Sequence, residues 1–349
     1  MAPTQETPGA AGHALLTAGG TAACLVLAEW LGLQHSALAV WTTYLVMVQY
    51  TYTRFQKGVE RVLGRGLGIL AGLVLTTWFH ATPLLTLVLI AVLLTASFYV
   101  YFSGRLAYTF LQAGLYVVGM FEIGHSDPAE VVSAAEAVFA AVVFGVVVAV
   151  VVSWLFGAER DLGMQFGTAP LWPLRGDWLS QSLMLAVTVL LTWMGARLLG
   201  LPPAKAAISV MLLTVAPHIQ AMVVKGELRI AGAFLATAWA AATFVVVGLL
   251  PHLLMLAGLL FLGQFVAAYL TRAGGKYAYA GLQMGIVLPM LVVAPKAEFG
   301  SLAPAAQRLE GILLGLVVSV VVAVLWPRFP RAAETPPVPP PNLPAEMEV

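Results

Sequence analysis

The stretch KGVERVLGRGLG, residues 57–68, places basic side chains directly before a glycine-rich apolar run. It returns in the second half of the chain as KGELRIAGAFL, residues 225–235. An offset of 168 aligns the two stretches without a gap and pairs Lys57 with Lys225, Arg61 with Arg229, and Gly64 with Gly232. Self-similarity at a fixed spacing indicates an internal repeat.

The repeat extends beyond these two stretches. The same offset pairs Leu31-Gly32-Leu33 with Leu199-Gly200-Leu201, an offset of 171 pairs Arg105, Tyr108 and Gln112 with Lys276, Tyr279 and Gln283, and an offset of 170 pairs Gly145 with Gly315. A register that drifts so little over several elements predicts two related halves.

The composition indicates whether this chain folds in water or in a membrane. Of its 349 residues 60% are hydrophobic and 9% are charged, whereas soluble domains carry about 25% charged residues. The mean hydropathy of +0.92 leaves room for up to about a dozen crossings of about 20 residues each. The sequence therefore predicts a polytopic membrane protein and excludes an ordinary soluble enzyme. A net charge of +1 offers no surface for nucleic acid, and the single cysteine, Cys24, excludes a disulfide framework.

Proline, glycine and charge clusters divide the chain into twelve apolar segments. Backbone polar groups in lipid must be satisfied within each segment, so every segment is predicted to be a helix. The segments are 14–33, 36–53, 62–80, 83–102, 106–122, 130–156, 179–199, 203–222, 230–249, 252–271, 277–295 and 306–326. Six crossings per half, an even number, give both halves the same orientation. The predicted fold is all-α, with two parallel six-helix repeats and a pseudo-twofold axis along the membrane normal.

The domain organisation follows from these segments. We expect an N-terminal segment at 1–13, the first repeat at 14–157, a linker at 158–177, the second repeat at 178–327 and a proline-rich disordered tail at 328–349. The first segment lacks a basic residue before it and is expected to be a retained helix. With the N-terminus inside, thirteen of the 17 basic residues lie at inner segment ends and four at outer ends. Both termini are therefore expected in the cytoplasm.

The duplicated basic residues are candidates for an anion pathway. Residues that match across the repeats occupy equivalent places around the axis, and a cationic ring at a pore mouth attracts anions. The candidates are the pairs Lys57 and Lys225, Arg61 and Arg229, and Arg105 and Lys276. The alternative is that they are anchors that reach for lipid phosphates.

A duplicated tyrosine and glutamine stripe follows the third pair. Tyr108 and Gln112 share a helix face with Arg105, and Tyr279 and Gln283 share one with Lys276. Such a stripe suits an aromatic carboxylate, because the ring can stack and the polar groups can bond. Interhelical packing is the alternative.

Two carboxylates inside apolar segments are candidates for proton coupling, because intramembrane charges are expensive. Glu29 lies in the outer third of the first segment, where its alternative is a residue at headgroup level. Glu136 lies in the sixth segment. For it we favour a structural ion pair with the matching region of the second half, which carries Gln307, Arg308 and Glu310.

No cofactor or metal is expected. The six histidines are scattered without metal spacing, and no Walker A sequence occurs. Gly64, Gly66 and Gly68 lack the strand and the spacing of a dinucleotide site, so we expect them to serve helix packing. An enzyme is not expected, and active transport would use an ion gradient.

The duplicated basic-glycine stretches and the paired tyrosine helices resemble the superfamily of fusaric acid resistance proteins and aromatic carboxylic acid exporters. The resemblance covers about 14–326. It implies a multi-pass exporter of organic acids in the bacterial inner membrane, working beside a periplasmic adaptor protein, with kinship to plant aluminium-activated malate channels. The chain departs from the larger members in its short cytosolic region, about 157–177. It also departs at Arg65, where small or hydroxyl residues are common and whose repeat partner is Ala233.

These observations favour export of small organic anions, aromatic acids above all, by proton exchange. A passive anion channel along the repeat axis is the alternative within transport. A membrane scaffold or assembly subunit that conducts nothing is the alternative from another class.

Overall fold

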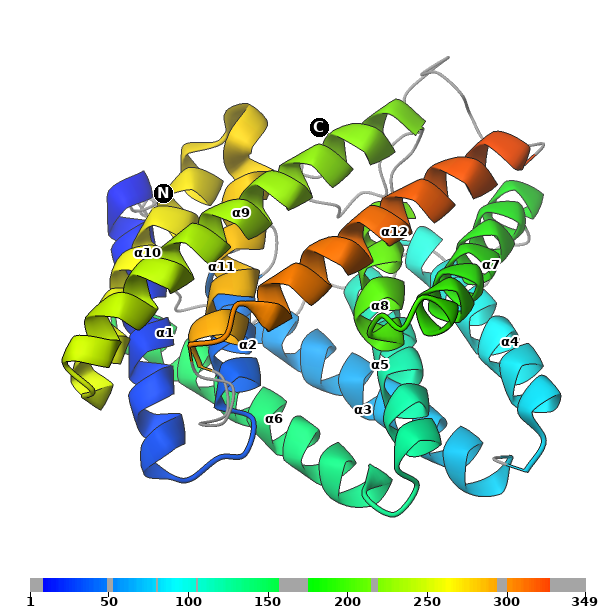
Figure 1. The fold of residues 1–349 in the computed structure, drawn as a ribbon, viewed down its shortest axis with the longest axis horizontal. Coiled ribbons are helices and arrows are strands. Elements are labelled where there is room, and N and C mark those ends of the chain that lie inside the picture. Colours follow the sequence, from blue (N-terminus) through cyan, green and yellow to red (C-terminus); the bar gives the residue numbers. More distant parts are fainter. Residues whose placement is uncertain are drawn as a thin grey trace, which may run out of the picture. The chain divides into compact units, whose positions relative to one another are not determined.

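The computed structural model describes residues 9–48, 53–79, 81–104, 106–156, 175–214, 219–293 and 300–326, except for the side chains of 83 and 212–214. Regular structure in these ranges is entirely helical (Figure 1). Arg105, most of the expected linker and the expected tail lie outside the described residues. The elements are α1 (Ala10–Trp30), α2 (Ser36–Met47), α3 (Arg54–Trp78), α4 (Pro83–Phe102), α5 (Ala107–Ser126), α6 (Val131–Leu155), α7 (Gly176–Leu198), α8 (Pro203–Thr214), α9 (Ile219–Leu249), α10 (Leu253–Ala273), the 3₁₀ turn η1 (Gly275–Tyr277), α11 (Ala278–Val292) and α12 (Ala303–Leu325).

The all-helical fold class is confirmed, and the helices number twelve in the described ranges. Seven of them are long and apolar enough to cross a membrane: α1, α4, α6, α7, α9, α10 and α12. The helices α2 and α8 have 12 residues each and α11 has 15, while polar side chains interrupt the apolar runs of α3 and α5. The structure therefore supports a polytopic membrane protein, with seven candidate spans in the part of the chain that it describes.

Two pairs of predicted boundaries were wrong. The helix expected at 36–53 ends at Met47, and α3 already begins at Arg54; likewise α8 ends at Thr214, and α9 begins at Ile219. The basic residues of 57–61 and 225–229, which we expected to precede the helices at 62–80 and 230–249, lie inside α3 and α9. Lysine, arginine and glutamate are good helix formers, so charge alone does not end a helix.

The chain forms two compact units. Unit 1 comprises Met1–Gly58, Ala141–Gly163 and Ala231–Leu302, and unit 2 comprises Val59–Ala140, Met164–Ile230 and Ala303–Val349. In unit 1, α1 packs on α2 and α10, and α11 packs on α10 and α2. In unit 2, α7 packs on α8 and α4, α5 packs on α4 and α8, and α12 packs on α7 and α8. Each unit thus draws on both predicted halves.

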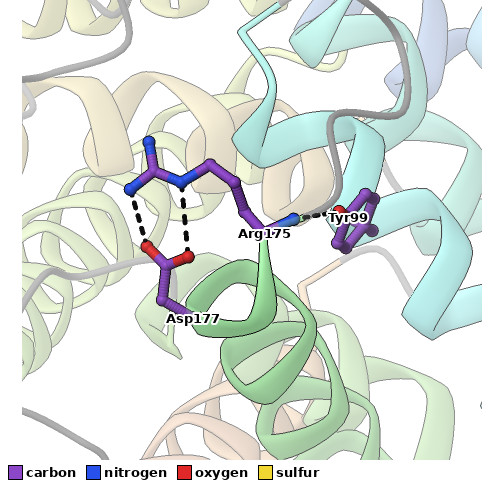
Figure 2. A network of polar contacts seen from close by, with 3 residues as sticks. All are labelled: Tyr99, Arg175 and Asp177. Carbon is purple, nitrogen blue, oxygen red and sulfur yellow. Dashed lines mark hydrogen bonds and ion pairs between the residues drawn. The ribbon is translucent and has the colours of Figure 1, made fainter.

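In unit 2 the first residues of α7 are fixed to the last turn of α4 (Figure 2). The Arg175 backbone N–H donates to Tyr99 Oη at 2.9 Å, and the Arg175 guanidinium pairs with Asp177 at 2.9 Å. The same guanidinium lies 4.6 Å from the Trp178 ring centroid. The contact with Tyr99 places the start of α7 beside the end of α4. Because α7 also packs along α4, the two helices are antiparallel.

Glycines bring α3 and α5 together in unit 2. A Cβ on Gly64 would overlap the carbonyl oxygen of Thr109, and a Cβ on Gly72 would lie 2.5 Å from Met120 Cβ. A Cβ on Gly124 of α5 would meet Thr76 of α3 in the same way. These contacts run in one direction along both helices, so α3 and α5 are parallel. Of the three glycines expected to serve helix packing, Gly64 and Gly68 confirm the expectation, because a Cβ on either would overlap a carbonyl oxygen of α5, whereas Gly66 makes no such close contact.

The glycine contacts generate a stability prediction. Gly64→Ala adds a methyl group where backbone already lies, and we expect it to lower the free energy of unfolding by about 1–3 kcal/mol. The matched control is Gly66→Ala on the same helix, whose Cβ would meet only Phe139, at 3.4 Å. We expect that control to be neutral or to gain up to about 1 kcal/mol of helix propensity. Thermal unfolding of purified protein in detergent measures both, and equal midpoints for the two variants would contradict the packing role.

Candidate functional site

Two arginines on α3 are buried against α5 in unit 2. The exposed fractions of Arg61 and Arg65 are 0% and 1%. An Arg61 nitrogen donates to Tyr108 Oη, and Arg65 Nε donates to Gln112 Oε1 at 3.3 Å. The Arg65 guanidinium carbon also lies 4.4 Å from the centroid of the Tyr116 ring. We call Arg61, Arg65, Tyr108, Gln112 and Tyr116 the arginine cluster.

Local sequence explains how the cluster forms. The two arginines are four residues apart on α3, and Tyr108, Gln112 and Tyr116 recur at the same spacing on α5. Residues four apart lie on one helix face. Because the helices are parallel and touch through Gly64, each arginine meets the residue at its own level. The result is a row of guanidinium groups on α3 that faces a row of phenol and amide groups on α5.

The chemistry of the cluster suits a planar anion. Guanidinium groups keep their charge in proteins and bind carboxylates through paired N–H donors. The α5 groups that contact them in the contacts named above are a phenol, an amide and an aromatic ring, and none of the three is a carboxylate. The arrangement therefore holds concentrated positive charge next to aromatic surface inside the protein.

The matching residues of the second half are distributed differently. Lys225 and Arg229 are buried on α9, with exposed fractions of 4% and 1%, and Lys57 on α3 is 2% exposed. A Cβ on Gly232 would overlap the Ala280 carbonyl oxygen and lie 2.7 Å from Gln283 Cβ, so α9 approaches α11 in unit 1 as α3 approaches α5 in unit 2. Gln283 is buried and Tyr279 is half-buried.

Lys276 is exposed, unlike the four buried cations. It lies exposed on the turn η1, and its Nζ is 4.9 Å from the centroid of the Tyr277 ring. Of the three predicted cationic pairs, the structure describes both members of two, because Arg105 lies outside the described residues. The burial of Lys57, Arg61, Lys225 and Arg229 within the protein is not typical of side chains that reach for lipid phosphates.

The two candidate coupling carboxylates are exposed. Glu29 is the penultimate residue of α1, and no protein burial desolvates its carboxyl group there. Glu136 on α6 is also exposed, and no ion pair of Glu136 occurs among the described residues. The structural pair that we favoured for Glu136 is therefore not formed in the part of the chain that the structure describes. In the same part, no group of three or more metal-ligating side chains gathers.

Arg65 and Tyr116 belong to the site, although the internal repeat does not predict them. Duplication selects residues that match across the two halves, whereas Arg65 aligns with Ala233 and departs from the repeat. The signal that identifies both residues is spacing within one helix, since Arg65 follows Arg61 by four residues and Tyr116 follows Gln112 by four.

The fold and the site define a polytopic membrane protein with a buried cationic and aromatic cluster. Residues 22–158 match the family described as fusaric acid resistance protein-like, so this part of the chain is a domain of that family. The domain contains the whole arginine cluster. No curated protein and no solved structure matches the chain.

The arginine cluster generates a second prediction about stability. Gln112→Leu removes the oxygen that accepts from Arg65 Nε while the buried charge stays, and we expect a loss of about 1–3 kcal/mol in the free energy of unfolding. Replacing a buried charged group by an apolar one of similar volume is often neutral or stabilising. The double variant Arg65→Met with Gln112→Leu should therefore unfold at a higher temperature than Gln112→Leu alone. Simple addition of two losses in thermal unfolding would contradict this account.

Proposed function

We propose that this protein is an inner-membrane exporter of small organic anions, with aromatic carboxylic acids as the substrate class and proton exchange as the driving reaction. The observation that carries the proposal is the arginine cluster, because it joins buried guanidinium groups to aromatic rings at a level where two helices meet. In this proposal the guanidinium groups of Arg61 and Arg65 bind the carboxylate. The rings of Tyr108 and Tyr116 stack on the aromatic body, and Gln112 fixes its orientation.

We also propose that the chain consists of two parallel six-helix repeats around a pseudo-twofold axis along the membrane normal. Three glycine contacts recur at the repeat offsets and support this. Gly58 meets Val146 as Gly226 meets Leu316, Gly64 meets Gln112 as Gly232 meets Gln283, and Gly145 meets Thr42 as Gly315 meets Val210. The members of each pair of contacts lie in different units. A repeat places equivalent residues around one pathway.

Two short helices at corresponding positions support a pathway near the basic residues. Within the described residues α2 and α8 have 12 residues each, about 18 Å, which is shorter than the hydrocarbon core of about 30 Å. Short or interrupted segments at matching places in two halves are a feature of transporter binding sites. The basic helices α3 and α9 follow them in the chain.

The wider set of pathway residues remains part of the proposal. It comprises Lys57, Lys225, Arg229, Arg105, Lys276, Tyr279 and Gln283 beside the cluster itself. Because Arg65 aligns with Ala233, the two halves are expected to contribute unequally, with the stronger anion site in the first half. The proposal keeps both termini in the cytoplasm and a periplasmic adaptor as a partner.

The pathway role predicts a transport defect without loss of protein. Arg61→Gln, Tyr108→Phe with Tyr279→Phe, and Gln112→Leu with Gln283→Leu should each lower benzoate export by about tenfold, as expected when a charged or buried hydrogen bond to substrate is lost. The measurement is uptake of labelled benzoate into inside-out vesicles at matched protein abundance. Controls are Arg175→Gln and Tyr269→Phe, which lie at exposed positions outside the cluster. Unaltered transport in all three test variants would refute the pathway.

The driving reaction has its own test. Acidifying the lumen of inside-out vesicles should drive benzoate accumulation against its gradient, and a protonophore should abolish it. Glu29→Gln and Glu136→Gln are compared in the same assay, and undiminished accumulation excludes the tested residue as the proton carrier. Anion currents that follow the benzoate gradient and do not depend on pH would indicate that the protein is a channel and not an exporter. Absence of any anion movement, together with a stably co-purifying partner, would indicate that the protein is a membrane scaffold and not an exporter.

A further inference from the structure

The last turns of α3 and α5 in unit 2 lie far from the arginine cluster and take part in a cavity. A cavity of about 70 Å³ opens between the last turns of α3, α5 and α7 and the first turns of α4. Its walls are mainly apolar and aromatic: Leu75, Thr76, Thr86, Leu87, Phe121, Gly124, His125 and Trp193. The arginine cluster begins at the opposite end of both helices, so the cavity is separate from it.

Three aromatic rings form one side of this cavity. The Phe121 and Trp193 ring centroids are 5.3 Å apart, and His125 lies 5.8 Å from Phe121 and 6.3 Å from Trp193. Rings in mutual contact hold one another in place, so the wall is rigid. A rigid apolar wall is typical of a small-molecule site.

Arg197 lies one helical turn beyond Trp193, which is one of the residues that line the cavity. Its guanidinium carbon is 5.1 Å from the Trp193 ring centroid, and its nearest acidic atom is Glu122 Oε2 at 4.0 Å. Among the residues that the structure describes, the Arg197 guanidinium donates no hydrogen bond, and its side chain is 39% exposed. Its N–H groups are therefore available to a ligand.

Glu122, the acidic residue nearest to Arg197, accepts hydrogen bonds from other side chains. Its Oε2 accepts from Trp193 Nε1 at 2.7 Å, and its Oε1 accepts from Ser126 Oγ at 3.4 Å. Both carboxylate oxygens thus already have protein donors, whereas Arg197 retains open donors. This asymmetry favours an anionic ligand over a cationic one.

We propose that this cavity binds a short-chain monocarboxylate, with the carboxylate on Arg197 and the hydrocarbon chain against Phe121 and Trp193. The size class follows from volume: the cavity is about half as large as an engineered cavity of about 150 Å³ that holds benzene, so chains of about two to four carbons fit. The site does not depend on the proposed transport, since binding here needs only unit 2.

Butyrate is the probe for this proposal, titrated by calorimetry into the purified full-length protein in detergent. We expect saturable butyrate binding, no binding of butylammonium at equal ionic strength, and weaker binding of naphthoate. Arg197→Gln should weaken butyrate binding by about tenfold or more, because it removes a charged hydrogen-bond donor. Leu87→Trp should abolish binding by filling the cavity from a half-buried position.

The matched control is Arg175→Gln at the other end of α7. Arg175 also stacks on a tryptophan and pairs with an acidic residue, but its tryptophan, Trp178, does not line the cavity, whereas Trp193 beside Arg197 does. Butyrate binding should be unchanged there. Absence of butyrate binding by the unaltered protein, equal binding of butylammonium, or wild-type affinity in Arg197→Gln would each overturn the proposal. Because no transport is measured, these outcomes are distinct from failure of the exporter proposal.

Discussion

The close approach of α3 to α5 is the contact on which the site depends. Gly64, Gly68 and Gly72 present bare backbone to α5 at successive turns, and a methyl group at any of them would push the helices apart. Only at this separation does the Arg61 side chain meet Tyr108, and that of Arg65 meet Gln112 and Tyr116. In membrane proteins this packing matters more than in water, because lipid offers no hydrophobic gain for bringing helices together.

The buried arginines are not explained by stability. Burying a guanidinium group removes its hydration, and Arg61 and Arg65 are only 0% and 1% exposed. Apolar residues would fill the same space at lower cost in a membrane. Charged residues inside a membrane protein are a functional indication by default. The burial of these arginines therefore supports a role in binding anions. It is stronger support than the number of basic residues in the chain.

The two ends of α7 in unit 2 use similar side chains for different purposes. Arg175 with Trp178 and Asp177 fixes the start of α7, and Arg197 with Trp193 and Glu122 stands near its end. The second set adjoins a cavity that is lined by Trp193 together with residues of α3, α4 and α5. A tryptophan beside an arginine is thus an anchor in one place and the rim of a proposed site in the other. The neighbouring helices make the difference.

Composition and periodicity by themselves determined the membrane class, the helical content, the packing role of the glycines and the candidacy of Arg61, Tyr108 and Gln112. These properties follow from solvent and from spacing within one helix, both of which are local. Tertiary structure alone decided that α2 and α8 are short, that Arg65 and Tyr116 join the cluster, and that Glu29, Glu136 and Lys276 are exposed. The physical reason is that burial depends on which faces of different helices meet. For a charged residue at a helix end, the sequence pattern is the same whether the side chain faces lipid, water or another helix.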